Sequence, residues 1–239
     1  MQQRIRLGRL GVAAVIAAVA VSAALAVTPT AGAARQRLAG TSPSASLAKG
    51  ELLRLSDFPK GWKATTTKSS ISSGTTSSTS QVDQIATCEG VSVSRLGRGA
   101  SAQISLSRPK ALQYVFEFVW VFSSASSATK AYRIFASSKA PGCLGPSLAK
   151  SISSGGTGNI TASSITTARL AFPKEGSATT AFRLGIPVKS TGQTVQVEAD
   201  VIAIRSGKSV ALFVPISIVT GFPTSLAHSL GKKAAARLK

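Results

Sequence analysis

Cys88 and Cys143 are the two cysteines of this 239-residue chain and carry its most reactive side chains. A redox motif normally places its cysteines close together in sequence, whereas 54 residues separate these two. We therefore expect them to form a structural disulfide rather than a redox couple or two free thiols. In the loop-entropy model, a crosslink over a loop of this length stabilises the fold by about 4 kcal/mol.

His228 is the single histidine, which excludes a multi-histidine metal site and leaves one candidate for histidine-based catalysis. It lies two residues from both Leu226 and Leu230, off the apolar stripe of a predicted helix, which favours a solvated side chain. No G-x-S-x-G elbow occurs and no acid flanks this histidine, so a Ser-His-Asp triad is not supported. Residues 155–158 lack the Gly-Lys-Ser/Thr of a phosphate-binding loop. We predict no enzyme activity, no catalytic residue, no metal and no cofactor.

Basic residues greatly outnumber acidic ones, with 28 Lys and Arg against 8 Asp and Glu and a net charge of +20. Four of them lie close together in sequence around Pro109 and are the candidate anion-binding residues: Arg95, Arg98, Arg108 and Lys110. Aromatic residues are not interleaved with them, which argues against a nucleic-acid partner. Two interpretations stay open: the cations keep the protein soluble, or they attract anionic envelope polymers or lipid headgroups.

The N-terminal segment has the pattern of a targeting signal. Residues 1–9 contain three arginines and no acid, residues 10–27 are apolar, and Ala31-Gly32-Ala33 follows as a small-residue cleavage site. We expect a signal peptide at 1–33; the alternative is a retained membrane anchor, since a spanning helix needs roughly 20 apolar residues. Cleavage lowers the net charge to +17 and places the chain outside the cytoplasm. There the cysteines can oxidise, and chromosomal DNA is not available as a partner.

The rest of the chain is predicted to contain one domain and two low-complexity stretches. Residues 34–48 are interpreted as a flexible leader, and residues 49–239 as a single domain. Within it, residues 65–80 are almost entirely Ser, Thr and Gly, which favours a long solvated loop. Their hydroxyls could also accept glycans.

Hydrophobic periodicity predicts a mixture of helices and strands. The strands are expected at 112–122, 160–172, 179–189, 194–205 and 209–219. The helices are expected at 49–55, at 81–88, from 124 to a break at Pro141-Gly142, at 144–152 and from Pro223 onward. The strand at 112–122 is apolar on both faces, so it should be central, with Glu117 paired in a salt bridge or at a wet edge rather than catalytic. Pro187 indicates an edge or a bulge. Together these elements predict an α+β domain, with a single mostly antiparallel sheet of about five strands and two longer helices packed on it.

Short motifs spread over residues 47–239 resemble a family of secreted or lipid-anchored actinobacterial proteins. The family includes the extracellular sensor domains of PknH-type serine/threonine kinases and related cell-wall lipoproteins. The motifs are Leu52-Leu53-x-Leu55-x-Asp57-Phe58-Pro59-x-Gly61-Trp62, Cys88-x-Gly90, Cys143, Ala181-Phe182-Arg183-Leu184, Asp200-Val201 and Arg205-Ser206-Gly207-Lys208. The resemblance implies one antiparallel sheet with helices, disulfides and no enzyme activity. Unlike the kinase-linked members, this chain is expected to have no kinase domain and no membrane-spanning linker after the signal region, and it also lacks the lipoprotein cysteine.

The leading hypothesis is therefore a non-catalytic, secreted, sensor-like module of the cell envelope. Its expected partner is an anionic envelope polymer, a lipid headgroup or an envelope protein, bound with the help of positive charge. The competing hypotheses are a secreted hydrolase that uses a serine with His228, and a purely structural envelope protein. The ligand and the oligomeric state do not follow from the sequence.

Overall fold

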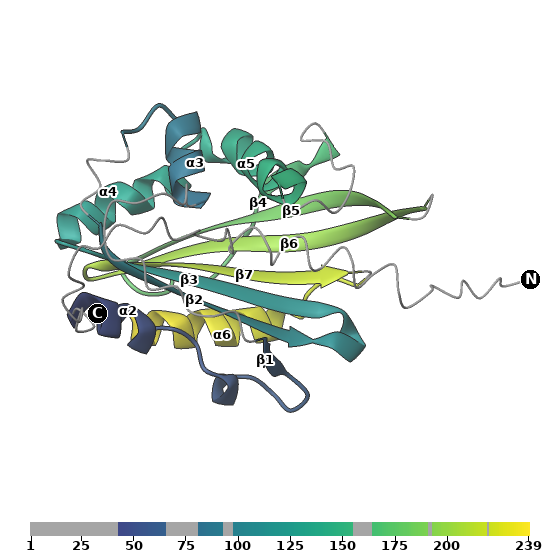
Figure 1. The fold of residues 1–239 in the computed structure, drawn as a ribbon, viewed down its shortest axis with the longest axis horizontal. Coiled ribbons are helices and arrows are strands. Elements are labelled where there is room, and N and C mark those ends of the chain that lie inside the picture. Colours follow the sequence, from purple (N-terminus) through teal and green to yellow (C-terminus); the bar gives the residue numbers. More distant parts are fainter. Residues whose placement is uncertain (1–42, 66–80, 93–97, 155–163, 191–192, 219) are drawn as a thin grey trace, which may run out of the picture.

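The structure, a computed structural model, describes residues 43–65, 81–92, 98–154, 164–190, 193–218 and 220–239 (Figure 1). The expected signal peptide at 1–33 and nearly all of the Ser/Thr-rich stretch at 65–80 lie outside these residues. No helix in the described part of the chain combines the length and the apolar character that a membrane crossing requires.

Seven antiparallel strands in the described residues form one sheet, in the order β1-β2-β3-β7-β6-β5-β4. They are β1 (Lys63–Thr65), β2 (Arg98–Arg108), β3 (Gln113–Phe122), β4 (Thr166–Arg169), β5 (Ala178–Ser190), β6 (Gln193–Ser206) and β7 (Ser209–Ile218). β3 and β7 pair at the centre, where Glu117 lies opposite Phe213. The chain thus leaves the sheet after β3, starts again at the far edge with β4 and returns strand by strand to the middle.

Helices cover both faces of this sheet (Figure 1). On one face, here named the α4 face, lie α3 (Gln81–Cys88), α4 (Ala125–Ala136) and α5 (Ala140–Ser154). On the opposite face, named the α6 face, lie α2 (Pro43–Gly50) and α6 (Thr224–Arg237). Two short 3-10 turns, η1 (Leu55–Asp57) and η3 (Pro109–Ala111), complete the described helical elements. Central strands covered on both faces must be apolar on both, as the sequence of β3 is.

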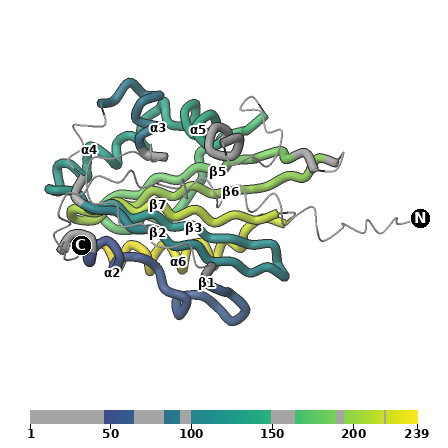
Figure 2. Tube along the Cα trace, viewed as in Figure 1, coloured from purple at the N-terminus to yellow at the C-terminus, as the bar shows by residue number. Residues whose placement is uncertain are grey.

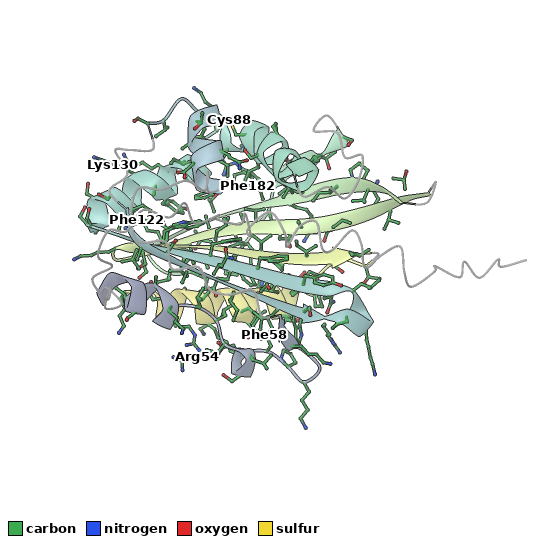
Figure 3. The ribbon with its side chains drawn as sticks, in the orientation of Figure 1. Arg54, Phe58, Cys88, Phe122, Lys130 and Phe182 are labelled. Carbon is green, nitrogen blue, oxygen red and sulfur yellow. A yellow bond between two sulfur atoms is a disulfide. The ribbon has the colours of Figure 1, made fainter. Side chains whose placement is uncertain are left out.

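The two faces of the sheet bury separate hydrophobic cores. On the α4 face, Phe122 and Phe182 pack against residues of α4 such as Phe135 (Figure 3). On the α6 face, Phe213 packs with Leu230 and the other buried residues of α6. α4 begins where expected, because Ser124 accepts a hydrogen bond from the backbone N–H of Ser127 at 3.1 Å and so caps the helix.

The end of the chain lies against α2 (Figure 2). The backbone N–H of Lys239 donates to Glu51 Oε1 at 2.9 Å, and its carbonyl accepts from Lys208 N at 3.0 Å. Lys208 belongs to the tight β6–β7 turn, in which Gly207 has a φ of +51°. A Cβ at Gly207 would approach the Lys239 carbonyl carbon to 2.4 Å, so only glycine lets the chain end dock there.

Several predicted elements are confirmed, whereas the predicted sheet is too small. β3, β5, β6, β7, α3 and α6 lie within about two residues of the predicted ranges, whereas α4 begins as predicted but ends at Ala136, before the predicted break. β1 and β2 were not predicted, so the sheet has seven strands and not five. Three helices, not two, are long: α4 has 12 residues, α5 has 15 and α6 has 14. Of the predicted strand 160–172, the structure describes β4 and places residues 160–163 outside its described part.

The predicted helix break at Pro141-Gly142 is wrong. α5 begins at Ala140 and runs through this pair. Ser137 Oγ accepts from the backbone N–H groups of Lys139 and Ala140, both at 3.1 Å, and supplies the start signal. Proline is tolerated in the first turn of a helix because its missing N–H would have no partner there.

The N-terminal helix is displaced from its predicted position. α2 covers Pro43–Gly50, largely within the stretch predicted as a flexible leader, and ends where a helix at 49–55 was expected to begin. Ala48 is fully buried in the core of the α6 face. Burial of this apolar side chain against the sheet stabilises a helix that its Ser- and Ala-rich sequence only weakly indicates.

Candidate anion-binding site

β1 forms one edge of the sheet, and a tight turn positions it. Pro59 keeps Phe58 out of helical geometry, and Gly61 has a φ of +94° that suits glycine. The rings of Phe58 and Trp62 meet at 4.9 Å between centroids, and Trp62 meets Phe222 at 6.1 Å. Both Phe58 and Trp62 are buried, and they fix the turn to the core of the α6 face.

Four cations surround this edge and are here named the β1-edge cluster: Lys60, Lys63, Arg108 and Lys110. The register pairs Lys63 with Ser107, which places Lys63 diagonally across from Arg108. A Cβ at Gly61 would lie 3.7 Å from Arg108 Nε, so this guanidinium borders the turn that carries Lys60. Successive side chains of a strand point to opposite faces of the sheet, and Lys63 is paired with Ser107, the residue before Arg108. Lys63 and Arg108 therefore point to opposite faces, so positive charge is present on both sides of this edge.

The acids of the chain do not neutralise this cluster. Glu51, Glu117 and Asp200 are buried, with relative exposures of 1%, 0% and 4%. Asp57 pairs with Arg237, whose Nη2 lies 2.8 Å from Oδ2. The guanidinium groups of Arg183 and Arg237 contact the carboxylates of Glu198, Asp200 and Asp57. The positive excess therefore remains on the surface, and the three lysines of the cluster are exposed.

The four predicted anion-binding residues do not form one site. Arg98 begins β2 and Arg108 ends it, which separates them by roughly 33 Å at 3.3 Å per residue. Arg95 lies outside the described residues. Arg108 and Lys110 do lie together, at the β1 edge with Lys60 and Lys63, which the sequence analysis did not select. A sequence signal that could have identified them is the weak alternation at 98–108, which indicates a strand with which the residues near Lys63 could pair.

Glu117 is buried more deeply than predicted. Its Oε2 accepts a 2.6 Å hydrogen bond from the backbone N–H of Leu53, and none of the described residues bonds its Oε1. Neither the predicted salt bridge nor a wet edge is seen around it in the described part of the chain. Desolvation raises the pKa of Glu117 to about 8, against the opposing effects of Leu53 and Arg237.

His228 packs on a ring instead of lying free in solvent. It is half-buried on α6, and its imidazole meets the edge of Phe172 at 5.0 Å between ring centroids. No hydrogen bond or ion pair to a carboxylate is seen for it among the described residues.

The Cys88–Cys143 disulfide is confirmed. The Cα atoms are 5.8 Å apart, and the bond ties the end of α3 to the first turns of α5 on the α4 face. Over the described ranges, no group of three or more His, Cys, Asp or Glu residues is placed to hold a metal ion.

Comparison with known proteins finds similarity to a solved structure but not to a protein family. No protein-family model matches the sequence, and no curated protein matches it. Among solved structures, the extracellular domain of PknH from Mycobacterium tuberculosis is similar, with a TM-score of 0.46 and 13% identity. The alignment covers 83% of this chain and 98% of that one. This is the kind of domain that the motifs resemble, but a TM-score below 0.5 does not establish a shared fold or function.

Proposed function

We propose that this chain is a non-catalytic, secreted binding module of the cell envelope and that the β1-edge cluster attaches it to an anionic envelope component. The ligand chemistry is a row of phosphate or carboxylate groups, on a polymer or on lipid headgroups. The observation that carries the proposal is the distribution of charge among the described residues: Glu51, Glu117 and Asp200 are buried and Asp57 is ion-paired, whereas Lys60, Lys63 and Lys110 are exposed at one edge of the sheet.

Two features support the compartment in this proposal. The N-terminal sequence has the order of a signal peptide, and the Cys88–Cys143 disulfide is of a kind that persists in oxidising surroundings outside the cytoplasm. Outside a cell, anionic polymers and lipid headgroups are the abundant counterions for a cationic protein.

The test is cosedimentation of the full chain with vesicles of phosphatidylglycerol and phosphatidylcholine, and its retention on immobilised polygalacturonate. A cation near an anionic surface contributes about 1 kcal/mol, so the double variant Lys60→Gln/Lys63→Gln should bind about 30-fold more weakly. Binding of the unaltered chain should also weaken as salt is added. The two supports separate a phosphate-bearing from a carboxylate-bearing partner.

The matched control is Lys130→Gln/Lys139→Gln, which removes the same charge from exposed positions on the α4 face (Figure 3). This control should bind almost as well as the unaltered chain. Equal losses in the two double variants would show that net charge alone drives binding and would overturn the β1-edge cluster as a site. No binding to either support at low salt would overturn the electrostatic attachment itself.

A further inference from the structure

A second candidate site lies on the α6 face, near the opposite edge of the sheet from β1. It is a cleft of about 420 Å³ lined by residues of β4, β5, β6, β7 and the connection to α6. Its lining consists of Thr166, Ala168, Arg183, Gly185, Gln196, Val197, Glu198, Ser217, Thr220 and Gly221. The volume falls within the range of about 300–1,000 Å³ that small-molecule sites occupy.

An ion-pair network forms one wall of this cleft. Arg183 Nε donates to Asp200 Oδ1 at 2.7 Å and Nη2 donates to Oδ2 at 2.9 Å, while Glu198 Oε1 lies 3.5 Å from Nε. Asp200 is buried, whereas Arg183 and Glu198 keep 39% and 34% of their side chains exposed. A buried ion pair adds little to stability because desolvation offsets its attraction. The geometry does fix the orientation of a guanidinium and a carboxylate that remain open to the cleft.

Two glycines keep this wall accessible. A Cβ at Gly185 would lie 2.6 Å from Thr166 Oγ1, and one at Gly221 would lie 3.1 Å from Glu198 Oε1. Any side chain at these positions would displace the polar atoms that line the cleft. Because these two positions carry no side chain, a ligand can reach both the Thr166 hydroxyl and the Glu198 carboxylate.

The charge of the cleft selects against the anions that suit the β1-edge cluster. Arg183, Glu198 and Asp200 together carry one net negative charge, in an otherwise cationic protein. The lining offers donors from the Arg183 guanidinium and the Gln196 amide, and acceptors from the Glu198 carboxylate and the same amide. The hydroxyls of Thr166 and Ser217 donate to the carbonyls of Gly185 and Thr220 and are left as acceptors. Donors and acceptors that line the same cleft match a pair of neighbouring hydroxyl groups, each of which both donates and accepts.

We propose that this cleft binds a neutral saccharide, with Arg183, Gln196 and Glu198 hydrogen-bonding its vicinal hydroxyls. None of the lining residues is aromatic, so recognition relies on hydrogen bonds and on the methyl groups of Thr166 and Ala168. β5, which contributes Arg183 and Gly185 to the cleft, lies five strand spacings from β1, or about 24 Å across the sheet. The two sites are therefore independent, and this proposal does not rest on the proposed function.

The experiment is a titration of the ¹⁵N-labelled full chain, followed by two-dimensional NMR. The probes are methyl α-D-glucopyranoside and methyl α-D-mannopyranoside, with inorganic phosphate and ethanolamine as charged comparisons. Binding of either glycoside should shift the amide signals of Gly185 and Gly221 and the Arg183 Nε–H signal. Phosphate should leave these signals in place. Glycosides that move none of them, or shifts caused only by a charged probe, would overturn the proposal.

Variants then assign the contacts. Glu198→Gln removes a charged acceptor at constant size and should weaken glycoside binding about tenfold, whereas Glu175→Gln, in the turn before β5 and outside the cleft lining, should not. Thr166→Val, at an exposed position of β4, provides a second test if Glu198→Gln unfolds the chain. Unchanged affinity in Glu198→Gln, or in Thr166→Val where that variant replaces it, would overturn the assignment.

Discussion

Replacing the buried Glu117 with glutamine should remove a pH-dependent loss of stability. Burial raises the pKa of Glu117 from 4.5 to about 8, so the folded chain keeps this proton at pH values where the unfolded chain has released it. The residue therefore imposes no penalty below about pH 4.5, and the free energy of unfolding falls as the pH rises from there to about 8. Burial also raises the pKa of Glu51, which adds a change of the same sign.

The size of the effect follows from this shift. A rise from 4.5 to about 8 corresponds to about 5 kcal/mol of unfolding free energy lost between these pH values, at about 1.36 kcal/mol per unit. The side-chain carbonyl of glutamine can still accept the hydrogen bond from the Leu53 N–H. Its NH₂ group, however, is buried with no acceptor among the described residues, which lowers the free energy of unfolding by about 1–3 kcal/mol. Glu117→Gln should thus be close to the unaltered chain in stability near pH 5. It should be about 2–4 kcal/mol more stable near pH 8.

Urea unfolding followed by tryptophan fluorescence, from about pH 5 to about pH 8, measures this difference. Comparing the variant with the unaltered chain at each pH cancels the titration of groups that do not contact Glu117. Glu175→Gln, the same chemical change at a partly exposed turn residue, should show no such trend. A difference between Glu117→Gln and the unaltered chain that stays constant over this range would refute the reasoning, because Glu117 would then titrate alike in both states.

Two further predictions concern contacts that link distant segments. The double variant Cys88→Ser/Cys143→Ser should lose about 4 kcal/mol of unfolding free energy, because the unfolded chain regains the entropy of its crosslinked loop; an unchanged urea midpoint would contradict the loop-entropy account. Arg237→Met should cost about 2 kcal/mol, since it leaves the largely buried Asp57 carboxylate without its charged partner. Arg133→Met, at an exposed position of α4, is the control in urea unfolding, and an equal loss there would show that the ion pair adds nothing specific.

The elements with strong local signals could be predicted from the sequence. β3 alternates large aromatic residues such as Phe116 and Phe118, and α4 combines an apolar stripe with the Ser124 cap. β2 was missed because its buried face holds small residues such as Ala100 and Ala102 between serines, so its alternation is weak. The prediction made α5 too short because the sequence does not distinguish a proline in the first turn of a helix from a proline that breaks a helix. The hydrogen bonds to Ser137 Oγ, which mark Pro141 as the first kind, are seen only in the structure.

Of the predicted anion-binding residues, Arg108 and Lys110 lie at the β1 edge whereas Arg98 does not, and the reason is topological. Arg98 and Arg108 are close in sequence, but they are the first and last residues of the extended strand β2 and therefore lie at its opposite ends. Lys60 and Lys63 are about 45 residues away from Arg108 in sequence and become its neighbours through the β1–β2 pairing. Pairing between distant strands leaves little trace in local periodicity.

The amino-acid sequence by itself determined the charge, the two cysteines with the spacing of a structural disulfide, the signal-like N-terminus and the alternation of the central strands. Each of these depends on composition or on neighbours a few residues apart. Only the tertiary structure decided which acids are withdrawn into the core, which cations share an edge, and that Arg183 and Glu198 border a cleft. Burial and proximity arise when the sheet brings distant segments together, and they are not properties of any segment alone.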